Sequence, residues 1–220
     1  MRTIRFLATG FALLIVPQVG SAQEGRLFKD SWFWGAKVGN VKYATREESG
    51  YAQLIGGEWL ITRTRGALYV ALDETFFGKS RISSVDDPFA NPTFKTNVAL
   101  NDMTRITVAG MVFPNVRRGF LRPYAGAGFA ILNFHSAKAV GIGGNGAQDQ
   151  FVREAVEDSR TGASFVGILG LQAQFRRLSA FGQASMMPAR SSNFLLNEKT
   201  TLLFETGLRY NVGTSIDRPF

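Results

Sequence analysis

The stretch Thr201–Val212, TLLFETGLRYNV, lies near the C-terminus and has the period-two pattern of a β-strand. Every second residue from Leu202 onward is mostly apolar, whereas the residues between them include Glu205, Gly207 and Arg209. Successive side chains of a strand point to opposite sides, so this strand has one apolar face and one mixed face. Such a strand needs neighbours, and the upstream sequence indicates whether they form an open or a closed sheet.

Seven further segments upstream have the same alternation and are separated by turn or loop sequences. With the last strand they make eight, and the connections between them alternate between long and short. An even number of antiparallel strands in up-and-down order predicts an all-β fold, an eight-stranded antiparallel β-barrel. The upstream strands are predicted at Trp32–Tyr43, Tyr51–Thr62, Ala67–Phe77, Thr104–Phe113, Phe120–Phe134, Ala163–Phe175 and Leu178–Met187.

The long connections are rich in Asn, Pro, Gly and charged residues, which are typical of loops. We expect loops at Gly78–Met103, Ser136–Gly162 and Ala189–Lys199. Within the second of these, Phe151–Asp158 is compatible with one or two helical turns. The three short connections are tight turns that hold two arginines each: Arg63 and Arg65, Arg117 and Arg118, and Arg176 and Arg177.

The N-terminus has the pattern of a cleavable signal peptide. A basic start, Met1–Arg5, precedes the apolar run Phe6–Val16, and small residues follow at Gly20–Ala22. The apolar run is too short to cross a bilayer as a helix, which takes roughly 20 residues. We therefore predict a signal peptide at residues 1–22 and a mature barrel domain at residues 23–220.

The mixed face of the strands decides between a membrane barrel and a soluble, lipocalin-like ligand carrier. On a soluble barrel this face would meet water and be dense in charged residues. Here it is mostly small or uncharged, as a narrow lumen requires, and the opposite face is apolar in every strand. The pattern predicts a transmembrane barrel, with aromatic girdles from Trp32, Trp34, Trp59, Tyr69 and Tyr210. The small or uncharged lumen residues are Gly35, Gly39, Gly56, Gly126, Gly128, Gly170, Gly207, Ser164, Gln172 and Gln174.

A few charged residues share the lumen face with these small ones. Their charges sum to zero, which suits a narrow interior where buried charges need partners. We predict that they form a structural network that plugs the lumen, with Lys37 pairing with Glu205 where the first and last strands meet. The predicted network consists of Lys37, Glu58, Asp73, Arg105, Glu205 and Arg209.

Composition excludes several kinds of chemistry. The chain has no Cys, so it forms no disulfide, thiolate metal site or Cys nucleophile. The formal charge is +8, and loss of Arg2 and Arg5 with the signal peptide lowers it to +6. A basic protein raises the question of nucleic acid, but export argues against that partner.

No catalytic, cofactor or metal site is predicted. His135 is the only His, and the adjacent Ser136 points to the opposite face of a strand, so the two are poorly placed to act together. The loop carboxylates lack the spacing of a calcium loop. The glycines of Val140–Gly146 do not lie between a strand and a helix, so they predict no phosphate site.

The phrase Arg122–Gly128, RPYAGAG, together with the signal peptide, the eight strands and the terminal Phe220, resembles the small outer-membrane barrels of the OmpA, OmpX and OmpW types. The resemblance implies an outer-membrane location, with both termini and the short turns in the periplasm. It also implies contact with outer-membrane lipids, with the barrel assembly machinery through the C-terminal strand, and with an unidentified extracellular partner of the long loops. The chain departs from the pattern at Gly213–Arg218, which separates the last predicted strand from Phe220.

The resulting functional expectation is a non-enzymatic barrel with a structural or surface-interaction role. Two alternatives stay open at this point. One is a small pore or conduit for apolar molecules, and the other is a lipid-modifying membrane enzyme.

Overall fold

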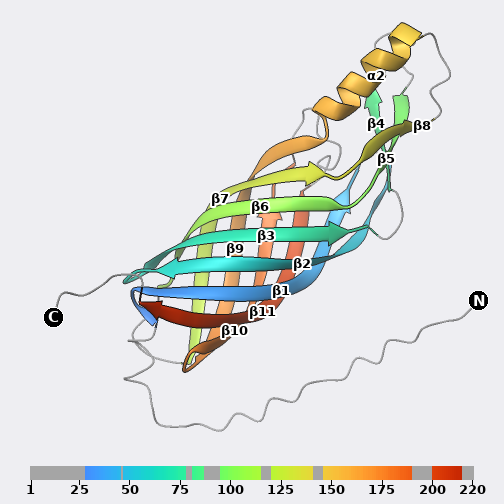
Figure 1. The fold of residues 1–220 in the computed structure, drawn as a ribbon. Helices are drawn as coiled ribbons and strands as arrows, with labels where there is room; N and C mark the ends of the chain where they lie inside the picture. Colours follow the sequence, from blue (N-terminus) through green and yellow to red (C-terminus); the bar gives the residue numbers. More distant parts are fainter. Residues whose placement is uncertain are drawn as a thin grey trace, which may run out of the picture.

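Eight strands close into one antiparallel barrel, which confirms the predicted fold (Figure 1). The structure, a computed structural model, describes residues 28–45, 47–77, 81–86, 95–114, 120–140, 146–189 and 200–214; the predicted signal peptide lies outside them. Around the barrel the strand order is β1-β11-β10-β9-β7-β6-β3-β2. The bounds are β1 Ser31–Ala44, β2 Ser49–Thr62, β3 Gly66–Phe76, β6 Met103–Val112, β7 Leu121–Phe134, β9 Thr161–Phe175, β10 Leu178–Met187 and β11 Thr201–Thr214.

The barrel closes where the first strand pairs with the last. Val38 lies opposite Thr206, and Gly39 lies opposite Glu205. Strand β11 runs two residues beyond the predicted end, since Gly213 and Thr214 pair with the start of β1. The predicted end at Val212 is therefore wrong by two residues, because a glycine after the apolar alternation does not prevent backbone pairing. Residues 215–220 lie outside the described part of the chain.

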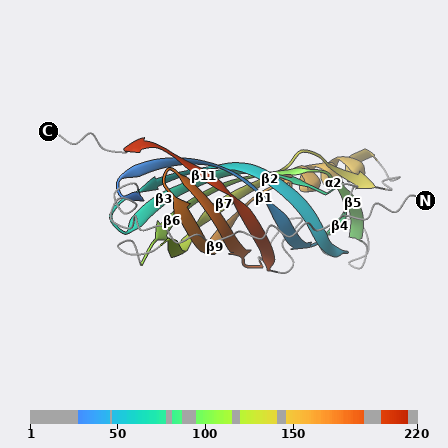
Figure 2. The ribbon, with the colours of Figure 1, turned by 90° about the horizontal axis from the view of Figure 1, so that it is seen from below.

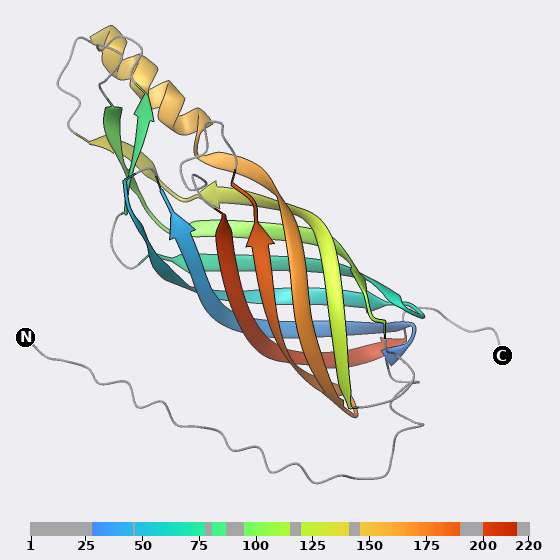
Figure 3. The ribbon, with the colours of Figure 1, turned by 180° about the vertical axis from the view of Figure 1, so that it is seen from behind.

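Two of the predicted long loops contain regular structure: their strands correct that prediction, whereas their helix includes the stretch Phe151–Asp158 that was expected to be helical. Strands β4 (Arg81–Asp86), β5 (Lys95–Leu100) and β8 (Ala137–Val140) form a second antiparallel sheet, and helix α2 spans Gly146–Asp158. We call these four elements the surface unit. Figures 1 and 3 show them together beyond one end of the barrel, and Figure 2 shows the chain leaving β11 at the opposite end.

The surface unit has a core of its own that continues into the barrel. Val98 and Leu100 of β5 are buried, as are Val152 and Val156 of α2. These residues belong to one hydrophobic cluster together with the barrel residue Phe134. The strands escaped prediction because they have only four to six residues, and because β8 comes from a different connection than β4 and β5.

The short connections are tight turns where the structure describes them. The β9–β10 turn consists of Arg176 and Arg177, and Arg176 has a φ of 54°, in the left-handed region. In the β2–β3 turn, Arg63 Nη1 lies 3.8 Å from Asp30 Oδ1. Arg117 and Arg118 lie outside the described residues.

The outer surface of the barrel is an apolar belt. Every barrel strand presents at least one exposed large apolar side chain; examples are Trp34, Ile55, Leu72, Val108, Phe129, Leu169, Leu178 and Leu208. Near the short-turn end, the Trp59 ring lies 5.3 Å from the Trp32 ring and 5.5 Å from the Trp34 ring. No helix in the described residues is long and apolar enough to cross a membrane.

One expected girdle residue lies inside the barrel instead. Tyr69 is 1% exposed, and its hydroxyl accepts a hydrogen bond from Lys37 Nζ at 2.9 Å. The alternation of β3 explains this position, because Tyr69 shares its parity with Ala71 and Asp73, which are also buried. Tyr210 is exposed on the outer surface, as expected.

Candidate functional site: the polar lumen

The structure places all six predicted lumen charges inside the barrel, each at most 4% exposed. They come from five strands, β1, β2, β3, β6 and β11, and each occupies an inward position of its strand's alternation. In the structure they fall into two groups. We call Lys37, Asp73, Arg105 and Glu205 the Glu205 cluster, and Glu58 and Arg209 the Arg209 pair.

The Glu205 cluster alternates two cations with two carboxylates. Glu205 Oε1 lies 2.7 Å from Lys37 Nζ and 2.7 Å from Arg105 Nη2. Asp73 lies on the other side of both cations, with Oδ1 2.9 Å from Lys37 Nζ and Oδ2 accepting from Arg105 Nε at 2.9 Å. Each charge therefore contacts two opposite charges, which offsets the desolvation that burial imposes on all four groups.

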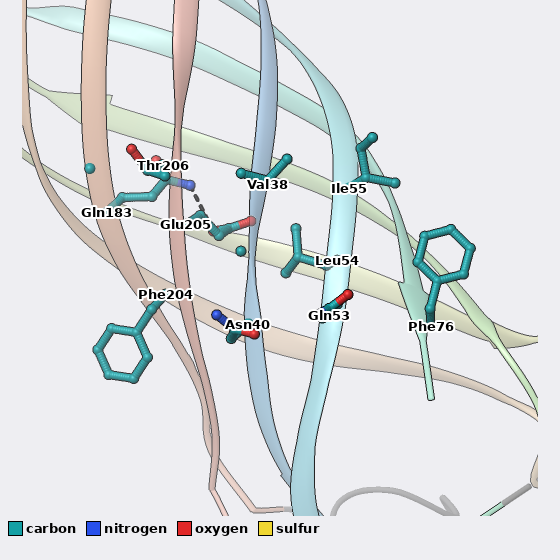
Figure 4. A pocket seen from close by; sticks show the side chains of 12 residues that line it. Val38, Asn40, Gln53, Leu54, Ile55, Phe76, Gln183, Phe204, Glu205 and Thr206 are labelled. Atoms are coloured by element: carbon teal, nitrogen blue, oxygen red, sulfur yellow. Dashed lines mark hydrogen bonds between the residues drawn. The ribbon is translucent and has the colours of Figure 1, made fainter. Parts of the chain in front are cut away.

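Neutral side chains complete the coordination of Glu205. Its Oε2 accepts hydrogen bonds from Gln183 Nε2 at 2.8 Å and from Ser185 Oγ at 3.0 Å, and Figure 4 shows the contact with Gln183. Gln183 Oε1 in turn accepts from the hydroxyl of Tyr124 at 2.9 Å. The contacts of this network join β1, β3, β6, β7, β10 and β11, so it crosses the lumen rather than lining one wall.

The Arg209 pair forms a second layer toward the short-turn end. Arg209 Nε donates to Glu58, and Nη1 donates to Gln172 Oε1 at 2.8 Å. Its guanidinium carbon lies 3.8 Å from the centre of the Phe181 ring and 5.4 Å from that of Tyr124. Arg209 and Glu205 lie on the same strand, but Arg209 pairs with Glu58. Glu205 pairs with Lys37 and Arg105.

Arg122 is a buried lumen charge that the prediction missed. It is 2% exposed, and its Nη1 donates to Gln174 Oε1. Its guanidinium carbon lies 4.7 Å from the Phe28 ring, which is fully buried against Phe113 near the short-turn end. Among the residues that the structure describes, Arg122 brings the sum of the buried lumen charges to +1, whereas the six predicted charges sum to zero. An amide oxygen and a ring face favour the extra cation.

The alternation of the sequence contained the signal for Arg122. It has the same parity in its strand as Tyr124, which also faces inward.

His135 lies on the outer rim of the barrel and not beside a nucleophile in the lumen. Its Nε2 is 2.8 Å from Thr104 Oγ1 and 3.2 Å from Glu74 Oε1, and Thr104 Oγ1 donates to Glu74 Oε2 at 2.8 Å. Because the Thr104 proton goes to Glu74, His135 Nε2 acts as a donor in this trio. The arrangement therefore does not activate the Thr104 hydroxyl.

Replacing Arg209 by Lys tests how specific the second layer is. Arg209→Lys is expected to lower the free energy of unfolding by about 2 kcal/mol, because an ammonium cannot bind Glu58 and Gln172 as a fork while stacking on Phe181. Urea unfolding in detergent micelles measures this change. Arg63→Lys, at a half-exposed turn position, is the control and should change stability by less than about 1 kcal/mol. Equal effects of the two substitutions would contradict a specific role of the guanidinium.

A closed eight-stranded barrel with an apolar exterior and an ion-paired interior has the fold of the small outer-membrane β-barrel proteins. The crystal structure of Neisserial surface protein A is similar, with a TM-score of 0.50 and 10% identity over 81% of this chain and 96% of that chain. No protein-family model and no curated protein sequence matches the chain.

Two further solved structures are similar with lower scores. One is the N-terminal β-barrel domain of Pseudomonas aeruginosa OprF, with a TM-score of 0.47 and 13% identity over 83% of this chain and 98% of that chain. The other is Ail, the attachment invasion locus protein of Yersinia pestis, with a TM-score of 0.44 and 9% identity over 83% of this chain and 99% of that chain.

Proposed function

We propose that the protein is a non-conducting outer-membrane β-barrel that holds the surface unit at the membrane surface, in a structural or surface-interaction role. The observation that carries this proposal is the filled lumen. The Glu205 cluster crosses it, the Arg209 pair lies below, and Arg122 with Phe28 occupies the short-turn end. A continuous aqueous path through the lumen would require these paired side chains to separate.

The apolar belt supports the membrane location. A soluble monomer rarely exposes a continuous apolar patch larger than a few hundred Å², whereas here the belt includes side chains from all eight barrel strands. A closed barrel also leaves no unpaired strand edge in the hydrocarbon, where an unmet backbone hydrogen bond costs several kcal/mol. The proposal includes removal of residues 1–22, assembly through the C-terminal strand by the barrel assembly machinery, and contact with outer-membrane lipids.

The proposed orientation puts the surface unit outside the cell and the short turns in the periplasm. The surface unit contacts the β1–β2 connection, since Ser84 Oγ of β4 donates to Glu47 Oε1 at 2.8 Å. The β5–β8 pairing continues toward the barrel through the hydrogen bond from Asn101 N to Ser136 O at 3.0 Å. Its exposed side chains carry both signs of charge, for example Lys138 and Glu154. A unit with its own buried core and exposed charges of both signs suits contact with an extracellular partner.

The lumen supports a plugged barrel over a pore or conduit. Separating a buried ion pair from its partner costs about 3–5 kcal/mol, and a continuous path would require several separations at once. The rim trio of Glu74, Thr104 and His135 does not supply an activated nucleophile, so the proposal assigns no enzymatic activity.

Conductance in planar bilayers tests the plugged lumen. We expect purified barrel, with insertion verified by heat-modifiable migration of the reconstituted protein, to give no sustained single-channel openings. Glu205→Ala is expected to give more frequent brief openings, since it frees Lys37 and Arg105 from one carboxylate. Glu154→Ala on α2 is the control and should leave the trace closed. Sustained openings of the unmodified protein would defeat the proposal.

A further inference from the structure

The outer wall of the barrel has a groove of about 730 Å³ where β11, β1, β2 and β3 lie side by side. Phe204 and Phe76 stand at its two sides, with Asn40 and Gln53 between them (Figure 4). These four residues form one register row, since Phe204 lies opposite Asn40, Asn40 opposite Gln53, and Gln53 opposite Phe76. The Cα atoms of Phe204 and Phe76 are thus three inter-strand spacings apart, roughly 14 Å along the sheet.

The floor of the groove changes from apolar to polar along the strands. Val38 and Ile55 lie on the side toward the short turns, and both are exposed. The amides of Asn40 and Gln53 occupy the next outward positions of β1 and β2 in the direction of the surface unit. Lys42 and Tyr51 occupy the outward positions after those. A lysine and a tyrosine on the outer face are typical of the level where the hydrocarbon meets the headgroups.

The side-chain amides of Asn40 and Gln53 are available to form hydrogen bonds with a ligand. Asn40 and Gln53 are exposed on the outer wall, and neither side chain has a hydrogen-bond partner among the residues that the structure describes. An amide at the edge of the hydrocarbon is stabilised when a neighbouring acceptor replaces the water it has lost. The ester carbonyls and the phosphate of a lipid lie at this level.

We propose that this groove, the seam groove, binds one phosphate-bearing acyl lipid from the leaflet on the side of the surface unit. An acyl chain lies along Val38 and Ile55, one outward position from the row that holds the two Phe rings. Asn40 and Gln53 donate hydrogen bonds to the ester or phosphate oxygens, and Lys42 contacts the phosphate. The proposal rests on the membrane location given above. Continuity of the groove with the apolar belt selects a bilayer lipid as its occupant, and Lys42 selects an anionic one.

The chain offers a matched pair of substitutions that separates groove filling from a general effect on the barrel. Gly182 borders the groove, and an added Cβ there would meet no described atom within 4 Å. Gly167, on the outer face of β9 and outside the groove lining, has equally open surroundings among the described residues. Gly182→Phe therefore adds a ring at the border of the groove on a Cβ that has room, and Gly167→Phe adds the same ring elsewhere on the belt.

Native mass spectrometry of the full barrel released from mild detergent measures lipid retention. With phosphatidylglycerol as the probe, we expect one tightly retained molecule on the unmodified protein and on Gly167→Phe, and at least tenfold weaker retention on Gly182→Phe. Lys42→Gln should weaken retention of phosphatidylglycerol about fivefold, the effect of one lysine near an anionic surface, without changing that of phosphatidylcholine.

Three results would overturn the inference: equal retention by Gly182→Phe and Gly167→Phe, equal retention of phosphatidylcholine and phosphatidylglycerol by the unmodified protein, or a lipid-free dimer as the stable species. Insertion into liposomes is measured on the same preparations. A barrel that inserts and stays closed but retains no lipid defeats the seam groove alone. A barrel that fails to insert defeats the proposed membrane function as well.

Discussion

Glu205→Gln is expected to lower the free energy of unfolding by about 3 kcal/mol. The substitution preserves shape but removes the charge that faces both Lys37 and Arg105 at 2.7 Å. Two buried cations then share only Asp73, and the cluster changes from neutral to +1. Because these contacts join β1 and β6 to β11, we expect the loss to appear as easier opening of the closed barrel.

Urea unfolding in detergent micelles, followed by tryptophan fluorescence and by heat-modifiable migration, measures this loss. Glu157→Gln on α2, which removes an exposed carboxylate, is the control and should change stability by less than about 1 kcal/mol. Lys37→Met added to Glu205→Gln restores neutrality and should recover part of the loss. An unfolding midpoint for Glu205→Gln equal to that of the unmodified protein would refute the closure role of this residue.

Gly128→Ala is expected to cost about 3 kcal/mol or more, although it adds a single methyl group. A Cβ at Gly128 would lie 2.1 Å from the carbonyl oxygen of Val108 and 2.5 Å from Ala109 Cα, both in the backbone of the neighbouring strand β6. Backbone atoms within a ladder cannot move aside as a side chain tip can. The β6–β7 pairing would have to shift to accept the methyl group.

Gly110→Ala provides the matched control, since it lies in the same strand pair but faces outward. A Cβ there would meet no described atom within 4 Å, so we expect it to leave stability unchanged or slightly raised. The yield of folded, heat-modifiable barrel and the urea midpoint distinguish the two variants. If Gly128→Ala folds as well as Gly110→Ala, the lumen is less crowded at this level than the structure indicates.

Both predictions concern the inner wall, where the barrel has little freedom to adjust. Side chains fill the lumen of an eight-stranded barrel. The neighbours of each inward position therefore limit the size of the side chain that fits there. The charged clusters occupy levels where partners on other strands provide opposite charge. The glycines occupy positions where a neighbouring backbone or a large side chain comes close, as Tyr124 does at Gly170. The outer wall has no such constraint, and its composition follows the apolar surroundings.

The eight barrel strands, their two faces and the six charges inside follow from the sequence alone. Strand alternation is a local property with a period of two, so the parity of Glu205 or Asp73 shows its face without knowledge of any neighbour. The same rule applied fully would also have placed Tyr69 and Arg122 inside. Both residues share the parity of buried neighbours, Ala71 for Tyr69 and Tyr124 for Arg122.

Which of these side chains contact one another depends on how the barrel closes. Arg105 and Glu205 are 100 residues apart, and Arg209 and Glu58 are 151 apart, so their contacts depend on the register and stagger of a closed sheet. The surface unit likewise depends on β5 pairing with β8 from another connection. The seam groove exists because residues of β11, β1, β2 and β3 align in one row across the closure. The strand that supplies Glu205 is defined by its sequence, but its role at the seam follows from the way the barrel closes.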